Sequence, residues 1–284
     1  MTEVPLPRAF EWVRCAWGRA LRCRPLEDIA THLFTTRVPV LTDHLLVPGD
    51  GWHRIARELG VSPRAIVRLR QVHGTGVVVI RQGEPTRTGA PGWGTGDISV
   101  SNDPGVVLCA QVADCTPVLI ADRRSGVAAA VHAGWRGTAQ GACAAAVAAL
   151  RAEFGVDPGH LVAAIGPSIG PCCYRVGADV RDAFEAAGRW GAALDEWFSD
   201  APAGTALRGI PGSDHALQGG RRSVFLDSWT ANADQLARAG VPEAQIHVAR
   251  LCTSCHRDVF HSYRVDGART GRMAAVIRAA AAGR

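Results

Sequence analysis

The middle of the chain contains three short apolar segments separated by only a few residues. They cover Gly105–Ala113, Pro117–Asp122 and Gly126–His132. Each is too short for a stable helix, and turn-forming residues lie between them. Because a short continuous apolar run is typical of a strand buried on both faces, we interpret the three as central strands of a covered sheet.

Residues 138–154 are expected to form a helix, with Thr138 as its N-cap and Gly155 at its end. Further strands are expected at 65–72, 76–81, 161–165 and 245–249, further helices at 177–187, 227–239 and 271–281, and irregular loops at 84–96 and 199–220. Hairpin-like spacing beside strand–helix units indicates an α/β fold with a mixed sheet. We expect an N-terminal extension over residues 1–30 and a single domain over 31–284.

The composition excludes several classes of protein. Hydrophobic residues make up 47% of the chain and charged residues 20%, which favours a folded core over disorder. No apolar run reaches about 18 residues, so no membrane partner is expected. All 31 basic residues are arginine. Without lysine, Schiff-base enzymes, P-loop nucleotidases and protein kinases are excluded.

Charge and cysteine usage indicate the partners and the compartment. The formal net charge is +5, but the arginines are scattered rather than gathered in a basic block. Nucleic-acid binding is therefore not expected, and small phosphate-bearing substrates fit the charge equally well. The nine cysteines are an odd number, and no signal-peptide pattern precedes them, so we expect reduced thiols and a cytoplasmic protein. Either a monomer or a homodimer is expected.

Three reactive side chains stand at the ends of the expected strands, where α/β folds place ligands. They are His73, Cys115 and His132. Two imidazoles and a thiolate suit zinc, and a three-ligand site leaves a fourth position for water. Two alternatives use the same residues without metal. Cys115 and the histidines could be structural, or Cys115 could be a nucleophile with His132 as its base.

Other polar residues have weaker patterns. Cys252 and Cys255 form a single C-x-x-C pair, and a zinc ribbon needs a second pair, for which the adjacent Cys172 and Cys173 are sterically poor. We therefore expect Cys252 and Cys255 to be reduced and free of metal, with a structural metal or a redox disulfide as alternatives. Arginines 37, 136 and 264 are candidates for binding phosphate or carboxylate, with structural ion pairs as the alternative.

Five ordered motifs resemble one protein family. They are Gln-Val-His-Gly (71–74), Ala-Asp-Cys-Thr-Pro-Val-Leu (113–119), Val-His-Ala-Gly-Trp-Arg-Gly (131–137), Ile-Gly-Pro-Ser-Ile-Gly-Pro-Cys-Cys-Tyr-Arg-Val-Gly (165–177), and a C-terminal Cys-Thr followed by Phe-His-Ser-Tyr-Arg-Val-Asp-Gly (260–267) and Thr-Gly-Arg-Met (270–273). The chain is similar over residues 32–277 to the YfiH, or laccase-domain, family of purine nucleoside phosphorylases.

The resemblance implies a four-layer α-β-β-α sandwich and a zinc ion held by His73, Cys115 and His132. It implies phosphorolysis of adenosine, inosine, guanosine and 5′-methylthioadenosine, together with hydrolytic deamination of adenosine. An older description of the family, polyphenol oxidase or laccase, implies copper instead. A non-catalytic module that binds purine or metal is the remaining alternative.

For these reactions we expect Arg136, and then Arg37, to bind phosphate, and Asp114 to move a proton. The sequence departs from the family pattern near one of these residues. The N-terminal Thr-Arg-x-Gly-Gly-Val-Ser motif appears only as Thr35-Thr36-Arg37, followed by Val38-Pro39-Val40. A second departure is Phe260-His261, where the family has two phenylalanines. The first change is expected to reshape one wall of the substrate pocket.

Overall fold

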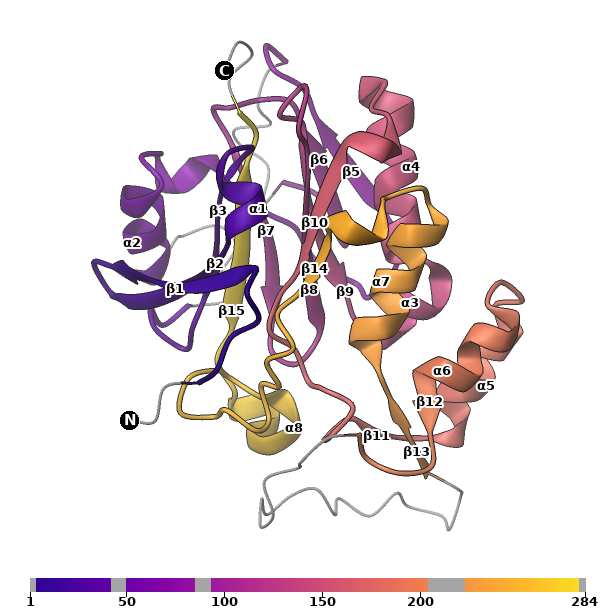
Figure 1. Ribbon diagram of the computed structural model, residues 1–284. Helices are drawn as coiled ribbons and strands as arrows, with labels where there is room; N and C mark the ends of the chain where they lie inside the picture. Colours follow the sequence, from indigo (N-terminus) through magenta and orange to yellow (C-terminus); the bar gives the residue numbers. More distant parts are fainter. Residues whose placement is uncertain (1–3, 42–49, 85–92, 204–222, 281–284) are drawn as a thin grey trace.

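Two mixed sheets packed face to face form the centre of the molecule, and helices cover their outer faces (Figure 1). The computed structural model describes residues 4–41, 50–84, 93–203 and 223–280. The arrangement is the four-layer α-β-β-α sandwich that the resemblance implied.

Each main sheet has six strands. In spatial order the first contains β1 (Phe10–Cys15), β2 (Gly18–Cys23), β3 (Thr31–Thr35), β15 (Met273–Arg278), β7 (Val107–Val112) and β4 (Ile66–Arg68). The second contains β14 (Ile246–Val248), β10 (Leu161–Ile165), β8 (Thr116–Asp122), β9 (Ala128–Ala133), β6 (Ile98–Ser101) and β5 (Val77–Ile80). A small third sheet contains β11 (Arg175–Gly177), β13 (Ser223–Leu226) and β12 (Phe198–Ser199).

The described residues also form eight helices. They are α1 (Arg24–Glu27), α2 (Asp50–Glu58), α3 (Trp135–Gln140), α4 (Ala142–Phe154), α5 (Ala178–Ala186), α6 (Leu194–Trp197), α7 (Ser228–Arg238) and α8 (Tyr263–Asp266). Helix α2 covers the first sheet, and α4 and α7 cover the second (Figure 1). Among the described residues, no helix combines the length and the hydrophobicity needed to cross a bilayer.

Side chains of the central strands alternate between two buried layers. In β8, Leu119 and Ala121 face the opposite sheet, whereas Val118 and Ile120 face the layer of α4 and α7. In β7, Leu108 likewise faces the opposite sheet, and its neighbours pack toward α2. Both faces are therefore apolar, which explains why these strands appear in the sequence as continuous runs rather than alternating patterns.

The predicted helix at residues 138–154 is divided into two. Helix α3 already begins after Gly134, so Thr138 is inside a helix rather than its N-cap. Gly141, with φ +90°, ends α3 and starts α4. Gly155, in the left-handed conformation, ends α4 as predicted. The strands and the other helices expected up to residue 249 are present, with shifted ends.

The predicted helix at residues 271–281 is wrong, because Met273–Arg278 form strand β15. β15 pairs with β3 on one side and β7 on the other. Met273, Ala275 and Ile277 are buried between the sheets, and Ala274 and Val276 pack on the α2 side. Alanine-rich composition favours a helix locally, but burial on two faces of a central strand overrides that preference.

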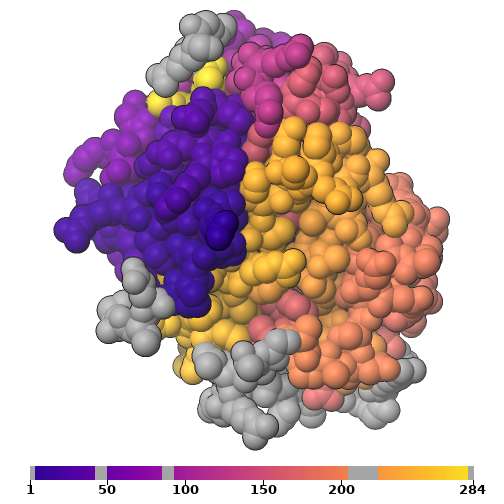
Figure 2. Space-filling model, viewed as in Figure 1, coloured from indigo at the N-terminus to yellow at the C-terminus, as the bar shows by residue number. Residues whose placement is uncertain are grey.

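Residues 10–23, expected in the N-terminal extension, form the paired strands β1 and β2. Because β2 also pairs with β3, the predicted boundary after residue 30 falls between two neighbouring strands of one sheet. In the space-filling view this N-terminal part (indigo) lies directly against the C-terminal part (yellow and orange, Figure 2). Most of the predicted loops at 84–96 and 199–220 lies outside the described residues.

Candidate metal centre

Strand register brings the predicted ligands together at one edge of the second sheet. Strands β8 and β9 are antiparallel, with Pro117 opposite His132, so Cys115, just before β8, lies beside the end of β9. Strand β6 pairs with the other side of β9, and the His132 backbone N–H donates to the Asp97 carbonyl at 2.8 Å. His73 comes from the loop between β4 and β5.

The ligand atoms of His73, Cys115 and His132 all lie within 4.8 Å of one another. The two imidazole rings meet edge to face, with their centroids 4.9 Å apart. Zinc–nitrogen bonds of about 2.0–2.1 Å and zinc–sulfur bonds of about 2.3 Å place tetrahedral ligands at separations within that limit. The donor set and its spacing therefore fit a single metal ion with one position left open.

Gly134 leaves room for this group. A β-carbon added there would lie 2.8 Å from Cδ2 of His73 and 3.2 Å from Sγ of Cys115. Any larger residue between β9 and α3 would therefore push against two of the three ligands. The glycine in the Val-His-Ala-Gly motif has a direct steric role in the site.

Asp97 organises the ligands from a buried position, with 2% of its surface exposed. Its Oδ1 accepts a hydrogen bond from Nδ1 of His132 at 2.8 Å, which leaves Nε2 of that ring for a metal. The same carboxylate accepts backbone N–H groups of Val72 (3.2 Å), His73 (2.9 Å) and Gly74 (2.8 Å). One side chain therefore orients one ligand and fixes the loop that carries another.

Charge inside the group favours a thiolate. Burial alone would raise the pKa of Cys115, but the charge of His132 and hydrogen bonds from both histidines lower that pKa to about 6. Burial lowers the pKa of His132, but the Cys115 thiolate and the Asp97 carboxylate raise it, and the net result is a pKa of about 9. Cys115 is therefore ionised near neutral pH, as a metal ligand must be. A metal-free thiolate–imidazolium pair is also what the cysteine-nucleophile alternative requires.

Asp114, the predicted proton carrier, makes other contacts in the structure. Its Oδ1 accepts the Thr253 hydroxyl at 2.5 Å, and its Oδ2 accepts the Ser262 hydroxyl at 3.1 Å and the Arg264 backbone N–H at 2.6 Å. Its φ of +79° turns the chain sharply just before Cys115. Asp114 thus anchors the C-terminal segment beside the metal ligands, and its part in proton transfer stays a prediction.

The metal-ligand group opens into a cavity of about 870 Å³, within the usual range for small-molecule sites. Trp135, Tyr174 and Ile169 provide apolar surface. Four arginines also line this cavity: Arg70, Arg175, Arg264 and Arg272. The combination suits a flat apolar ring joined to an anion.

The predicted phosphate ligands lie in different places. Arg264 lines the cavity, and its guanidinium donates to the Arg175 carbonyl at 2.8 Å and lies 5.6 Å from the Tyr174 ring centre. Arg136 is exposed and stacks on Trp135 at 4.2 Å, beside the cavity but not among its lining residues. Arg37 lines a separate cavity and donates to the Arg257 carbonyl at 2.6 Å. The structure therefore brings together the predicted metal ligands and Arg264, but not Arg37.

Sequence reasoning missed Asp97, Tyr174 and Arg175. Asp97 comes directly before the buried strand β6, as the predicted ligand Cys115 comes directly before the buried strand β8, and that shared position was the signal available. Tyr174 and Arg175 lie inside the recognised 165–177 motif, but only the fold shows that this segment turns toward the metal ligands.

These features define a class: an α/β sandwich with a His₂Cys metal-ligand group at the edge of one sheet, open to a basic cavity. Comparison with known families gives the particular one. The chain belongs to the family described as multi-copper polyphenol oxidoreductase laccase, whose model matches residues 50–280.

Several relatives are similar to this chain in sequence, and each is named a purine nucleoside phosphorylase. The protein from Deinococcus radiodurans is 37% identical over 79% of this chain and 74% of its own length. YfiH of Escherichia coli K12 is 36% identical over 77% of this chain and 75% of its own length. The protein from Bacteroides thetaiotaomicron is 36% identical over 62% of this chain, which spans only 58% of that relative.

Solved structures show the same fold. The hypothetical protein YfiH of Bacillus licheniformis superposes with a TM-score of 0.78 at 26% identity, covering 96% of this chain and all of that one. YlmD from Geobacillus stearothermophilus superposes with a TM-score of 0.75 at 28% identity, covering 97% of this chain and all of that one. The sandwich is therefore common to these proteins.

Replacement of Asp97 by asparagine tests its organising role. In Asp97→Asn the amide has only one oxygen, so it cannot accept all four hydrogen bonds that the carboxylate accepts from three backbone N–H groups and the His132 ring. We therefore expect zinc affinity to fall roughly ten- to hundredfold. Competition with a chromogenic chelator measures the affinity, and circular dichroism checks the fold.

Asp103→Asn is the matched control, because the Asp103 carboxylate also accepts a backbone N–H, from Gly105 at 2.7 Å, but in an exposed turn. Unchanged zinc affinity in a folded Asp97→Asn protein would contradict the assignment.

Proposed function

We propose that this chain is a metal-dependent purine nucleoside phosphorylase that binds zinc through His73, Cys115 and His132. The relatives' names point to this activity. The observation that carries the proposal is the cavity, in which the three ligands adjoin both apolar rings and four arginines. A purine and its ribose match the apolar surface, and phosphate matches the guanidinium groups.

Phosphorolysis needs phosphate held behind C1′ of the ribose. A phosphate oxygen forms a bond to C1′ while the bond from C1′ to N9 breaks, and the purine leaves with the electron pair and takes up a proton. Arg264 and Arg175 are placed to hold phosphate in the cavity. Burial raises the pKa of Tyr174, so its hydroxyl keeps its proton and can donate a hydrogen bond to the substrate.

The proposal includes adenosine, inosine, guanosine and 5′-methylthioadenosine as substrates, and deamination of adenosine as a second reaction. When bound, zinc would supply an activated water for that deamination, because it lowers the pKa of water to about 7. Asp114 is the proposed proton carrier, and its carboxylate also accepts a hydrogen bond from the Arg264 backbone N–H. Phosphate and nucleosides are the only partners in this proposal.

Copper remains the alternative metal, favoured by the description of the family. A blue-copper centre adds a weak axial ligand such as methionine to a His₂Cys set. Met273 is buried between the two sheets and does not line the cavity. Among the described residues it is the single methionine, so this part of the chain supports zinc over blue copper.

Product analysis tests the function. We expect the zinc-loaded protein to convert adenosine and phosphate into adenine and ribose 1-phosphate, and to release inosine by deamination. Cys115→Ser should lose both reactions, because the thiolate ligand is gone. Cys143→Ser is the matched control, since Cys143 is a buried residue of α4 that donates to Asn232 and is not among the residues that line the cavity. Nucleoside binding without turnover would indicate a binding module, and phenol oxidation with bound copper would indicate a laccase.

A second variant tests the phosphate contact predicted for Arg136. Arg136 lies in the first turn of α3, and the first backbone N–H groups of a helix can also bind an anion. We expect Arg136→Ala to raise the KM for phosphate, with zinc retained. The lost binding free energy should be about 1.5–3 kcal/mol, the range for hydrogen bonds to charged groups. Arg189→Ala, which removes an exposed arginine bound to the Gln140 carbonyl, should leave that KM unchanged. An unchanged phosphate KM together with lower thermal stability in Arg136→Ala would mean that this arginine only braces the turn.

A further inference from the structure

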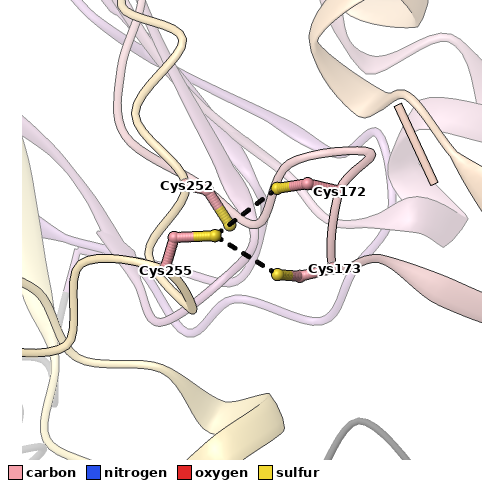
Figure 3. Close-up of side chains that lie close together, drawn as sticks. All are labelled: Cys172, Cys173, Cys252 and Cys255. Carbon is pink, nitrogen blue, oxygen red and sulfur yellow. Dashed lines mark hydrogen bonds between the residues drawn. The ribbon is translucent and has the colours of Figure 1, made fainter. Parts of the chain in front are cut away.

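A second group of metal-ligand side chains lies outside the His₂Cys centre. It consists of Cys172, Cys173, Cys252 and Cys255, whose sulfur atoms all lie within 4.8 Å of one another (Figure 3). The sequence predicted no partner for the Cys252–Cys255 pair. The fold places Cys172 and Cys173 beside this pair, so the premise that the pair has no suitable partners was wrong.

Sheet topology explains why the two cysteine pairs meet. Strands β10 and β14 are parallel neighbours, so the segments that follow them leave the same edge of the sheet. Cys172 and Cys173 follow β10, and Cys252 and Cys255 follow β14. Between the two segments, the Ser168 N–H donates to the Leu251 carbonyl at 3.2 Å and the Thr253 N–H donates to the Ser168 carbonyl at 3.0 Å. The pairs are thus held in register by the backbone.

The sulfur spacing matches one tetrahedral ion. Sγ of Cys255 lies 3.6 Å from Sγ of Cys172 and 3.4 Å from Sγ of Cys173. Four thiolates at about 2.3 Å from zinc are about 3.8 Å apart, whereas a disulfide needs about 2.05 Å. A multi-iron cluster would hold some of its cysteines farther apart than one ion does. The arrangement therefore favours one ion shared by all four sulfurs.

The surroundings suit a negatively charged centre. Four thiolates around a divalent cation carry a net charge of −2, which needs nearby donors. The Gly170 backbone N–H donates to Sγ of Cys252 at 3.3 Å. The Arg264 guanidinium donates to the Cys173 carbonyl at 3.4 Å and so places a positive charge beside the turn. Cys252 is 4% exposed, and the other three cysteines are half-buried.

We propose that these four cysteines bind a structural zinc ion, separate from the one at His73, Cys115 and His132. Binding releases the protons of the four thiols. All four positions are filled by protein, so the ion has no open site for substrate. It would tie the segment that carries Tyr174 and Arg175 to the segment that carries Arg264, and these residues form one wall of the substrate cavity.

The Cys115→Ser protein isolates the second site. We expect it to keep about one zinc per chain, with X-ray absorption showing only sulfur neighbours at about 2.3 Å. The double variant Cys172→Ser/Cys255→Ser should keep one zinc with mixed nitrogen and sulfur neighbours, and Cys143→Ser should keep two. The first measurement does not depend on whether the double variant folds. It also does not depend on enzyme activity, so the proposed function and this site can fail independently.

Three results would overturn the proposal. The first is zinc-free Cys115→Ser protein purified without chelator. The second is fewer than nine free thiols in the unsubstituted protein after denaturation with chelator, because disulfides would then have consumed some of its nine cysteines. The third is iron in place of zinc at an all-sulfur site. Nine free thiols and an all-sulfur zinc site together support it.

Discussion

The carboxylate of Asp97 makes the hydrogen bonds on which the candidate metal centre depends. It accepts hydrogen bonds from the His132 ring and from three consecutive backbone N–H groups in the His73 loop. These four donors stabilise its charge, and hydrogen bonds and the positive charge of His132 hold its pKa below the usual range despite burial. The charge in turn favours proton retention at Nδ1 of His132, so Nε2 faces the Cys115 thiolate. Removing this one carboxylate would disturb two ligands at once.

The second sheet gives that contact its rigidity. Cys115, His132 and Asp97 stand at the ends of three adjacent antiparallel strands, so their spacing follows from backbone pairing rather than from flexible loops. The loop that carries His73 packs closely against α3, where a β-carbon at Gly137 would lie 2.9 Å from the Gly74 carbonyl oxygen. Two parallel strands of the same sheet bring the four further cysteines to the same edge. Catalytic and structural metal sites would then share one scaffold.

Local sequence was sufficient for features that depend on a short segment. The buried strands, and the placement of the predicted ligands at their ends, follow from apolar runs and the residues beside them. Two errors came from pairing between distant segments. The local sequence of residues 273–278 favours a helix, but pairing with β3 and β7 makes them a strand. Cys252 and Cys255 have no partner nearby in the sequence, but the pairing of β14 with β10 brings two other cysteines beside them. Asp97 was missed for the same reason, since its four donors come from segments 23–35 residues away.

A crystal structure of the zinc-loaded protein, with anomalous diffraction measured on both sides of the zinc and copper absorption edges, tests the central claim most directly. We expect a peak at the zinc edge between Nε2 of His132, the His73 ring and Sγ of Cys115, with the Asp97 hydrogen bond to Nδ1 of His132 retained. A peak only at the copper edge would contradict the choice of zinc. No peak among these three side chains in zinc-replete crystals would contradict the metal centre itself.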